Sequence, residues 1–528
     1  MIIDARSITE NETLDCDICI VGAGAAGITL AQEFLNQDVK VLLLESGGIK
    51  YNANLDILNQ GEVDLSTHSS LEENRRRQLG GATTVWGGRS VPFDASDFEY
   101  KCHVPYSGWP ITKKDLDPYY ELAHKYCELG AYNYTVDGAK SIVAGLNSAD
   151  ISTEQIYLFS PPTNFGKRYL NVLKNAPNIT LLLNANCLKI ATDATGNSVD
   201  YLDVASLRKN KFRVRAKQYV LATGGLEVTR LLLVSNDVHK QGLGNRFNHL
   251  GRYYMGHINS YIKIQFAEKV PVIWDYQRFP DGLYYQHSIA IREEKRQEYG
   301  LLNQRFFVER PNFRDPSHQS GILSATYLTK SLIKKQKISQ DLSEHLKNII
   351  FDPQGMLGFS YKWITQRILS QKKLPSVIIE NKSKLYTFRI DSEQIPNPNS
   401  LVSLSESKDI FGINQLKVDW RCSELDIFSV EKSVEILKQT LENTGSGKVL
   451  PGIITSPPPQ AGHHLGTTRM SSTPQTGVVD ANCKVHDVSN LYIASSSVFT
   501  TSSYANPTLT VVALAVRLAD HIKRFYGK

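Results

Sequence analysis

The first fifty residues alternate long apolar runs with one glycine-rich turn. Residues 18–21 are apolar, residues 22–27 read Gly-Ala-Gly-Ala-Ala-Gly, and a second, almost wholly apolar run over 39–44 ends at Glu45. A strand that is apolar at nearly every position is typical of a parallel sheet that is covered on both faces. The order of strand, glycine turn, helix, strand and acid predicts a βαβ unit that binds a dinucleotide.

Each residue type in this unit has a physical reason. Gly22 permits the tight turn, Gly24 lets a pyrophosphate approach the backbone, and Gly27 lets helix and strand pack closely. The N-terminus of the helix then faces the phosphates. Glu45 is placed to accept hydrogen bonds from a ribose diol and would repel a 2′-phosphate. The pattern alone admits FAD or NAD.

Later patterns add strands to this sheet. Alternating positions predict strands from Asn178, over 212–215 and over 219–223. The last of these ends at Gly224-Gly225 and leads into a helical run over 226–234. This second junction of strand, glycine and helix is suited to packing against a cofactor.

The glycine signatures vanish between about residues 253 and 452. Alternating strands over 260–266 and 384–390 are mixed there with helical stretches, one of which runs over 429–443 and ends at Gly445. We interpret this part of the chain as a second, sheet-containing domain that supplies the wall of a substrate site.

Composition narrows the class of protein. The chain has 528 residues, enough for two or three domains, and its 41% hydrophobic and 21% charged content is ordinary for a globular protein. A net charge of +6 over this length does not argue for nucleic acid. The first fifteen residues carry four acids and no signal-peptide core, and no apolar stretch approaches a membrane span, so we expect a cytoplasmic protein.

The cysteines do not indicate a disulfide framework, because the seven are odd in number and scattered. Cys16 and Cys19 form a Cys-x-x-Cys inside the first predicted strand, where alternate side chains point to opposite faces. Buried thiols are therefore favoured over a redox or zinc site.

The segment 330–373 interleaves basic with large apolar residues. It could be a membrane-surface face or a partner-docking face. A solvated helical lid over a pocket is the interpretation that we favour.

A loop over 75–88, Arg-Arg-Arg-Gln-Leu-Gly-Gly-Ala-Thr-Thr-Val-Trp-Gly-Gly, has four glycines in nine residues. Such backbone must bend sharply or approach something closely. The alternative is a surface loop with a solvated basic run. Since the dinucleotide unit lies nearby in the sequence, we predict a loop that covers the cofactor.

The last seventy residues hold the candidate chemistry. His463 and His464 precede Leu-Gly-Thr, and a segment Tyr-Ala-Asn-Pro-Thr over 504–508 leads into an apolar helix over 508–523. We expect Pro507 in the first turn of this helix and Asn506 as its cap. The N-terminus of the helix would present a positive dipole to whatever lies before it.

Together, the glycine fingerprint, the 79–88 loop, Gly224-Gly225 and the C-terminal block resemble the glucose-methanol-choline (GMC) oxidoreductase family. The resemblance covers the first hundred residues, about 160–260 and the last seventy. The motifs Thr-Val-Trp-Gly-Gly and Ala-Asn-Pro-Thr-Leu-Thr are closest to the pyranose-oxidase-like and sugar-dehydrogenase-like branches.

The resemblance implies an α/β fold with a discontinuous, Rossmann-like FAD domain and a second α+β substrate domain built on an antiparallel sheet. We expect the FAD domain over 1–100, 160–255 and 452–528. The substrate domain and lid would occupy 256–451 with part of 101–159.

The resemblance also implies the site residues. The catalytic base falls on His463 rather than His464, and its polar partner on Asn506. An imidazole can take a hydroxyl proton near neutral pH, and a carboxamide can orient that hydroxyl. The positions expected to bind FAD are Gly22, Gly24, Ala25, Gly27, Glu45, Gly80, Gly81, Thr84, Trp86, Gly87, Cys187, Ala222, Gly224, Ala494, Ser495, Asn506, Pro507 and Thr508. No metal is expected.

Three positions depart from the family pattern. Val85 stands where some relatives attach the flavin covalently to histidine, so we predict dissociable FAD. Ser495 replaces Asp or Gly, which puts one ribityl or pyrophosphate contact in doubt. Thr500 replaces the usual Pro, so the loop that leads to Asn506 can be set differently.

The function expected from the resemblance is oxidation of a sugar, polyol or natural-product hydroxyl by hydride transfer to flavin N5. The electron acceptor would be O2, a quinone or a redox protein, and any haem would lie on a partner, because the chain has no Cys-x-x-Cys-His. Two alternatives are a lyase that uses FAD structurally and a nicotinamide enzyme. Integral membrane and nucleic-acid partners are not expected, and peripheral membrane contact is the less favoured reading of 330–373.

Overall fold

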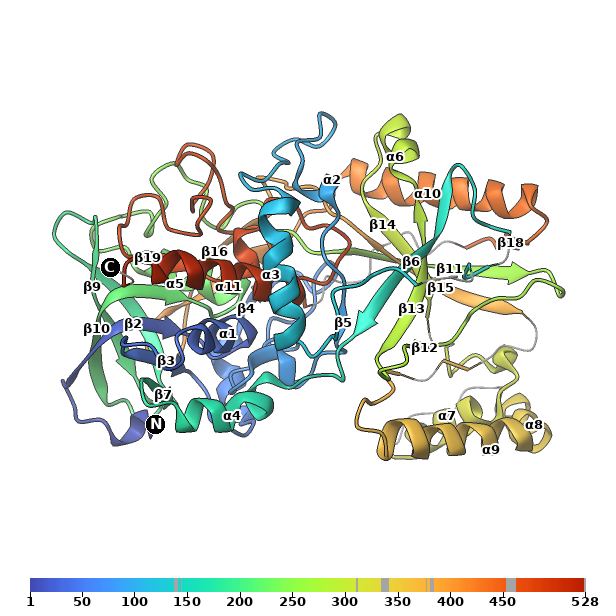
Figure 1. Ribbon diagram of the computed structural model, residues 1–528, viewed down its shortest axis with the longest axis horizontal. Coiled ribbons are helices and arrows are strands. Elements are labelled where there is room, and N and C mark those ends of the chain that lie inside the picture. The colour runs from blue at the N-terminus through green and yellow to red at the C-terminus, as the bar shows by residue number, and fades with distance from the viewer. Residues whose placement is uncertain are drawn as a thin grey trace.

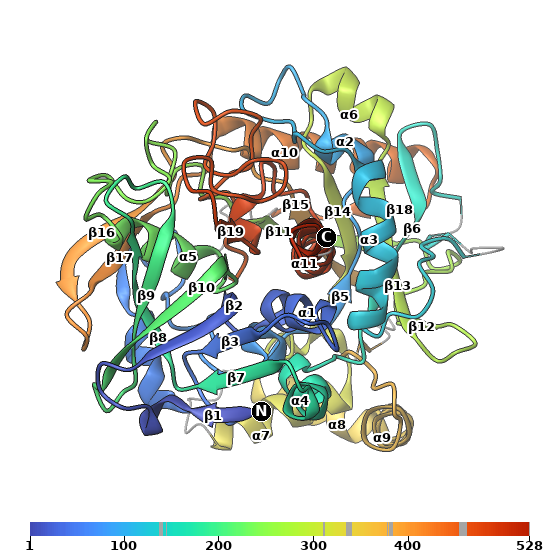
Figure 2. The same ribbon diagram turned by 60° about the vertical axis from the view of Figure 1, so that its left-hand side comes forward.

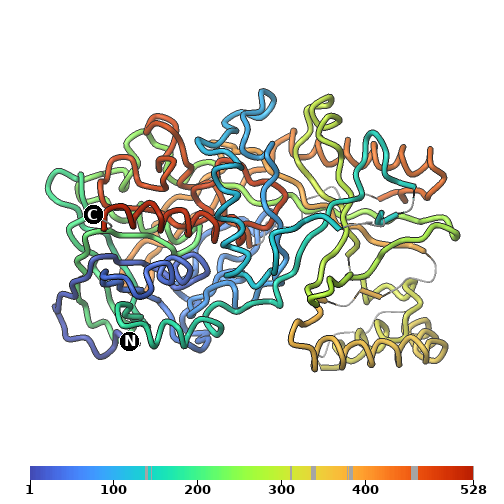
Figure 3. The backbone as a smooth tube through the Cα atoms, viewed as in Figure 1, coloured from blue at the N-terminus to red at the C-terminus, as the bar shows by residue number. Residues whose placement is uncertain are grey.

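The computed structural model describes residues 1–136, 141–143, 145–309, 312–333, 341–376, 378–379, 384–452 and 462–526. Figure 1 shows two lobes side by side, with both chain ends in one lobe and an antiparallel sheet in the other. In Figure 3 the blue N-terminal and red C-terminal segments run through the same lobe. Segments from both ends of the chain therefore build that half together.

The first lobe is built on an eight-stranded sheet in which six strands pair in parallel and β9 and β8 add an antiparallel edge. The central strand β3 is buried at all five positions. The strand order is β1 (Ile2–Asp4), β7 (Ile179–Leu183), β3 (Val41–Glu45), β2 (Thr13–Val21), β10 (Lys211–Leu221), β9 (Val199–Ala205) and β8 (Asn186–Thr192), with β19 (Leu491–Ile493) paired to β10.

Helices cover both faces of this sheet, as Figure 2 shows. On one face α1 (Ala25–Glu33) packs between α4 (Phe165–Asn175) and α11 (Thr508–Lys523), and α11 also packs on α3 (Lys113–Tyr126). On the other face α5 (Gly225–Val234) packs on β8 and on a three-stranded sheet of β16 (Leu401–Lys408), β17 (Asn414–Asp419) and β4 (Gly61–Val63). The predicted α/β domain and its βαβ unit are confirmed.

The second lobe is an antiparallel sheet with its own core of Ile, Phe and Val side chains. The predicted strands over 260–266 and 384–390 are its β11 and β15. Its order is β18 (Gly447–Val449), β11 (Ile258–Phe266), β15 (Leu385–Ser392), β14 (Gln304–Val308), β13 (Tyr284–Ile291), β6 (Ile151–Phe159) and β5 (Arg89–Ser90), with β12 (Gln277–Arg278) paired to β13.

Helix α10 (Glu424–Asn443) packs on this sheet and begins five residues earlier than predicted. Ser423 is its N-cap and accepts a hydrogen bond from the backbone of Asp426, whose side chain accepts from the backbone of Ser423 in return. This capping box fixes the start of the helix, so the predicted start at residue 429 was wrong. The predicted end at Asn443 is confirmed.

The remaining helices lie outside the two main sheets. The basic segment forms α7 (Gly321–Ile333), α8 (Leu342–Phe351), α9 (Pro353–Lys362) and the π-helical η5 (Trp363–Ile368), at the lower right of Figure 1. Its Lys334, Lys335 and Lys337 lie outside the described residues. Shorter elements are α2 (Ala95–Phe98), α6 (Glu293–Tyr299), η1 (Ala5–Ser7), η2 (Ala53–Asn59), η3 (Gly81–Thr84), η4 (Pro316–His318) and η6 (Ser496–Val498).

The cysteines of this fold, all among the described residues, form no disulfide. All seven cysteines are free, and Cys19 is buried in β2, where desolvation raises the pKa of its thiol. The buried-thiol interpretation is confirmed for Cys19, whereas Cys16 is only half-buried. Across the described ranges, no helix has both the length and the apolar character needed to cross a bilayer.

Candidate active site

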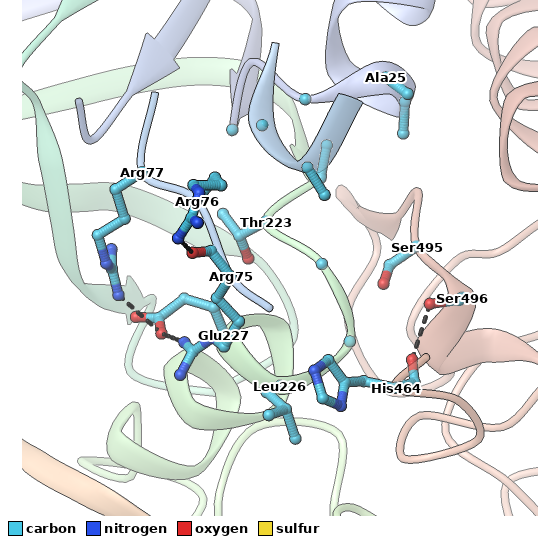
Figure 4. A pocket seen from close by; sticks show the side chains of 18 of the residues that line it. Ala25, Arg75, Arg76, Arg77, Thr223, Leu226, Glu227, His464, Ser495 and Ser496 are labelled. Carbon is cyan, nitrogen blue, oxygen red and sulfur yellow. Dashed lines mark hydrogen bonds and ion pairs between the residues drawn. The ribbon is translucent and has the colours of Figure 1, made fainter. Parts of the chain in front are cut away.

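A cavity of about 280 Å³ opens where the parallel strands of the first sheet end. Its lining comes from the turn after β2, the end of β3, the 75–86 loop, the residues that follow β10 and β19, and the start of α11. Figure 4 shows how these distant segments converge. Ligands bind in such crevices at the carboxyl ends of parallel strands.

The glycine turn shapes one wall of the cavity. Gly22 has a φ of 104°, and a Cβ on Gly27 would lie only 1.9 Å from the carbonyl oxygen of Gly22. A Cβ on Gly24 would meet nothing within 4 Å, so the backbone at the N-terminus of α1 faces open space. Gly22, Gly24 and Ala25 line the cavity, whereas Gly27 lies behind it in a packing position.

Glu45 lies in the next wall with its carboxylate oriented by backbone. Its two oxygens accept hydrogen bonds from the N–H groups of Ala23 (3.0 Å) and Gly47 (2.9 Å). Burial raises the pKa of this carboxyl, and the two N–H groups oppose the rise. Each oxygen keeps a second acceptor position that a ligand hydroxyl can use.

The 75–88 loop lies directly over the N-terminus of α1. The N–H of Gly80 donates to the carbonyl of Ala23 (2.8 Å), and a Cβ on Gly81 would lie 3.1 Å from Gly24 Cα. Gly81 and Trp86 line the cavity, and the Trp86 indole N–H donates to the Thr163 carbonyl (3.0 Å).

Three predicted positions of this loop lie outside the lining. Gly80 approaches Gly166 closely, since a Cβ on Gly80 would be 2.6 Å from the Gly166 nitrogen. The hydroxyl of Thr84 donates to the Gly81 carbonyl (2.9 Å), and a Cβ on Gly87 would meet nothing within 4 Å.

Three adjacent arginines form a wall that the sequence analysis did not assign to the site. Arg75, Arg76 and Arg77 all line the cavity, and Arg75 and Arg77 pair with Glu227 at 2.5 and 2.9 Å. Burial alone would raise the pKa of Glu227, but Arg77, Arg230 and Arg75 outweigh it and lower this pKa to about 2. Their position, separated by two residues from the double glycine Gly80-Gly81, was the available sequence signal.

The lining suits an anionic dinucleotide. Thr223 contributes a buried hydroxyl with no partner among the described residues, while the backbone of Gly24 is open and the arginines supply positive charge. A phosphate-bearing ligand would satisfy donors of this kind. FAD therefore fits the residues present. The other predicted positions on the lining are Cys187, Ala222, Gly224, Ala494, Ser495, Pro507 and Thr508.

The start of α11 differs from the prediction in one respect. Pro507, with φ −72° and ψ −18°, takes the N-cap position, and the helix begins at Thr508. Asn506 therefore does not cap the helix, because its side chain is turned toward His463 and Arg89. Pro507 and Thr508 still present the N-terminal end of α11 to the cavity.

His463 lines the cavity and contacts Asn506, a predicted FAD-binding position that lies outside the lining. His463 Nε2 lies 3.3 Å from Asn506 Nδ2, and His463 Nδ1 lies 3.2 Å from His257 Nδ1. The two imidazole rings meet edge to face, with centroids 4.7 Å apart. The structure thus brings the predicted pair together and adds His257.

One donor fixes the direction of this hydrogen-bond chain. Arg89 Nε can only donate, and it donates to Asn506 Oδ1 (2.8 Å), so Asn506 Nδ2 is the amide nitrogen that faces His463. His463 Nε2 must then be the acceptor, and its proton lies on Nδ1. His257 accepts that proton's hydrogen bond and donates from Nε2 to the Ser502 carbonyl (3.4 Å).

Arg89 is itself held by a buried acid. It pairs with Asp391, which also binds Arg389 Nε at 2.6 Å and Asn259 Nδ2 at 3.0 Å. Burial would raise the pKa of Asp391, but Arg389 and Arg89 lower it to about 2. Asp391 therefore stays ionised and anchors the arginine that orients Asn506.

Both histidines of this hydrogen-bond network, His463 and His257, are neutral near pH 7. Desolvation, and then the neighbouring His257, hold the pKa of His463 well below that of free imidazole. Desolvation lowers the pKa of His257 to about 4. A neutral imidazole with an acceptor nitrogen at the cavity is the state that a general base requires.

His464 has different contacts. Its Nδ1 lies 2.7 Å from the hydroxyl of Tyr254, which lies 2.9 Å from His68 Nε2. Burial lowers the pKa of His464 to about 3. His464 lines the cavity but is bound in this buried network rather than to Asn506.

The helical lid expected for the basic segment stays a prediction. No residue of α7, α8, α9 or η5 lines the cavity. Figure 1 shows α7, α8 and α9 on the second lobe. Trp363 belongs to η5 and is not among the residues that line the cavity.

Comparison with known proteins agrees with this geometry. Residues 396–515 match the family model described as GMC oxidoreductase. The fructose dehydrogenase large subunit of Gluconobacter japonicus is 24% identical over 97% of this chain and 98% of that protein. Paromamine 6′-oxidase of Streptomyces fradiae is 22% identical over 96% of this chain and 91% of its own.

Solved structures share the fold. Formate oxidase has a TM-score of 0.57 at 17% identity, covering 98% of this chain and 100% of that one. Pyridoxine 4-oxidase from Mesorbium loti has a TM-score of 0.55 at 16% identity, covering 96% and 99%. The relatives named here are dehydrogenases and oxidases and give no support to the lyase alternative. The family-model match over residues 396–515, the two relatives aligned over nearly the whole chain and the shared fold together make this chain similar to the GMC oxidoreductases.

Proposed function

We propose that this protein oxidises a hydroxyl group of a sugar, polyol or related natural product with non-covalently bound FAD, and that His463 is the general base. The observation that carries the proposal is the acceptor nitrogen of His463, which faces Asn506 at the end of the dinucleotide cavity. Relatives that act on sugar-like substrates by name, such as fructose dehydrogenase, support the substrate class.

Each side chain has a defined part in this reaction. His463 Nε2 accepts the hydroxyl proton, and the amide N–H of Asn506, 3.3 Å from that nitrogen, can hydrogen-bond the same oxygen. The Nδ1–H of His463 stays hydrogen-bonded to His257, which holds the ring in one tautomer. When bound, FAD supplies the acceptor for the hydride from the substrate carbon.

The surroundings favour the loss of the proton from substrate. The N-terminal end of α11 points its positive dipole into the cavity at Pro507 and Thr508. Negative charge that develops there is stabilised without any rearrangement of the protein. Arg89, anchored by Asp391, prevents the amide of Asn506 from turning over.

The two adjacent histidines provide a matched test of the assignment. We expect His463→Ala to lower kcat, per bound flavin, by about 10²–10⁴-fold with a sugar or alcohol substrate and an artificial acceptor. His464→Ala should lower the FAD content instead, because it removes a cavity wall, and should leave the rate per bound flavin within a few-fold. Equal rates per flavin for the two variants would refute the assignment.

A further inference from the structure

The outer helical surface, formed by α8, α9 and η5, turns apolar side chains to solvent. Neither α9 nor η5 has a single buried residue. Surface helices of globular proteins normally direct an apolar stripe toward the core. This surface does the opposite, and it is unrelated to the cavity of the proposed function.

The exposed residues form ordered stripes. On the continuous run of α9 and η5, Leu357, Tyr361, Ile364 and Ile368 are four, three and four residues apart, and they are 73%, 73%, 48% and 58% exposed. This spacing places them on one face of a helix. The neighbouring α8 adds its own exposed positions, Leu346, Ile350 and Phe351.

The polar and small residues of these helices hold the surface in place. Tyr327 of α7 contacts His345 of α8 with ring centroids 4.6 Å apart, and His345 Nδ1 lies 3.0 Å from the Ser324 hydroxyl. Asp352 accepts from the N–H of Gly321 (2.9 Å), and Lys362 pairs with Asp275 outside the segment. The surface is thus fixed on its inner side with its apolar side outward.

The charge of the chain is concentrated in the same segment. Residues 330–373 contain nine Lys or Arg and three Asp or Glu, a surplus of six. The whole chain has 59 basic and 53 acidic residues, so all other residues carry 50 of each sign. The entire net positive charge therefore belongs to this segment, but Lys330 lies on α7, and Lys334, Lys335 and Lys337 lie outside the described residues. Residues 341–373, which carry the outer helical surface, contain five Lys or Arg and three Asp or Glu, a surplus of two.

Part of this charge is paired at the surface. Lys347 pairs with Glu344 at 2.7 Å, and Lys372 with Asp281 at 3.0 Å, with at least one partner of each pair half exposed or more. Exposed pairs of this kind are weak, so both lysines can exchange their partner for an external anion.

The combination of charge and apolar area selects the partner. A second copy of the chain would bring the same positive surplus face to face, which is repulsive. An anionic bilayer offers phosphate groups for the lysines and an acyl boundary for the stripes. Tyr361 and Trp363 suit the interface between the phosphate groups and the acyl chains, because amphipathic aromatic rings favour that depth of the bilayer.

We propose that the outer helical surface docks this protein on an anionic lipid bilayer, with the stripes of α8, α9 and η5 inserted at the boundary of headgroups and acyl chains. The contact is peripheral, because the described helices include none able to span a bilayer. An apolar patch of this kind on a monomer marks an interaction site. The second lobe would face the lipid, and the first lobe, which holds the cavity, would lie away from the membrane (Figure 1).

Vesicle sedimentation with the full chain tests the proposal. We expect binding to phosphatidylcholine vesicles that contain roughly 30 mol% phosphatidylglycerol to be at least about tenfold tighter than binding to phosphatidylcholine alone, and weaker at high salt. Leu357→Ser with Ile364→Ser should weaken this binding about tenfold or more. Lys347→Glu with Lys373→Glu should weaken it as well while the stripes remain intact.

The control uses exposed apolar residues elsewhere. Leu65 and Tyr100 are 66% and 73% exposed, and Leu65→Ser with Tyr100→Ser should leave vesicle binding unchanged. Equal Tm values would show that all variants fold. The proposal is overturned if the protein does not bind anionic vesicles or binds neutral vesicles equally well. It is also overturned if the stripe variant, Leu357→Ser with Ile364→Ser, binds anionic vesicles as tightly as the wild type. A dimer that the stripe variant dissociates in sedimentation velocity would also overturn it, since a second copy would then cover the surface.

Discussion

At the residue scale, one obligate donor determines the chemistry of its neighbours. Arg89 fixes the amide of Asn506, the amide fixes the tautomer of His463, and the tautomer leaves Nε2 as the acceptor. The sequence pointed to His463 and Asn506 through the family motif. It had no means of pointing to Asp391, because that carboxylate reaches the site only through the pairing of β15 in a different sheet.

The pH profile of kcat/KM for Asn506→Asp tests this series of hydrogen bonds. The proposed base, His463, has a pKa well below that of free imidazole, so kcat/KM should show no decline as pH falls through about 6.5. A carboxylate at position 506 would stabilise the protonated imidazole and raise that pKa, so activity should be lost at a higher pH. Asn506→Ala should lower kcat without moving the acid limb upward.

One outcome would contradict the proposed contact between residue 506 and His463. If Asn506→Asp and the wild type lose activity over the same acidic range, the side chain at 506 does not face the base. Flavin content measured on each variant separates this result from simple loss of cofactor.

At the element scale, the sequence predicted the regular helices and strands better than the residues at which they begin. The βαβ unit, α5 and the end of α10 follow from apolar runs and glycines. The start of α10 was missed although Ser423 and Asp426 have the spacing of a capping box. The basic segment is helical as expected in α7, α8 and α9, but the mixture of apolar and basic residues does not say which way an apolar stripe faces.

The glycine turn provides an element-scale prediction with its own control. Gly27→Ala would place a Cβ 1.9 Å from the Gly22 carbonyl oxygen, so we expect loss of several kcal/mol of stability, about 3 kcal/mol or more, and of folded protein. Gly24→Ala has open space for its Cβ, so the Tm of the apoprotein should be unchanged while FAD affinity falls. Equal Tm losses in both apoproteins would contradict the steric account.

The loop before Trp86 predicts how the cofactor is attached. Val85 is 58% exposed and has no nucleophilic atom, so FAD should be released when the protein is precipitated with acid. Flavin absorbance in the supernatant measures this release. Yellow colour that stays with the washed precipitate would mean that a covalent bond forms at another residue.

At the scale of the whole molecule, the site belongs to neither lobe alone. Arg89 lies in β5 and Asp391 in β15 of the second sheet, whereas Asn506 leads into α11 of the first lobe. Periodicity in a sequence predicts elements, not which distant elements meet, and this is why Arg89 and Asp391 could not be assigned beforehand. The proposed reaction therefore depends on both lobes being correctly joined.

The central claim is that bound flavin takes a hydride from a substrate hydroxyl, and the anaerobic visible spectrum of the purified protein tests it most directly. An oxidised flavin band at about 450 nm should be present and should bleach when the right sugar or alcohol from a panel is added without oxygen. The same addition to His463→Ala should bleach the band far more slowly. A flavin band that no sugar or alcohol reduces, or a protein that neither contains nor takes up FAD, would contradict the account.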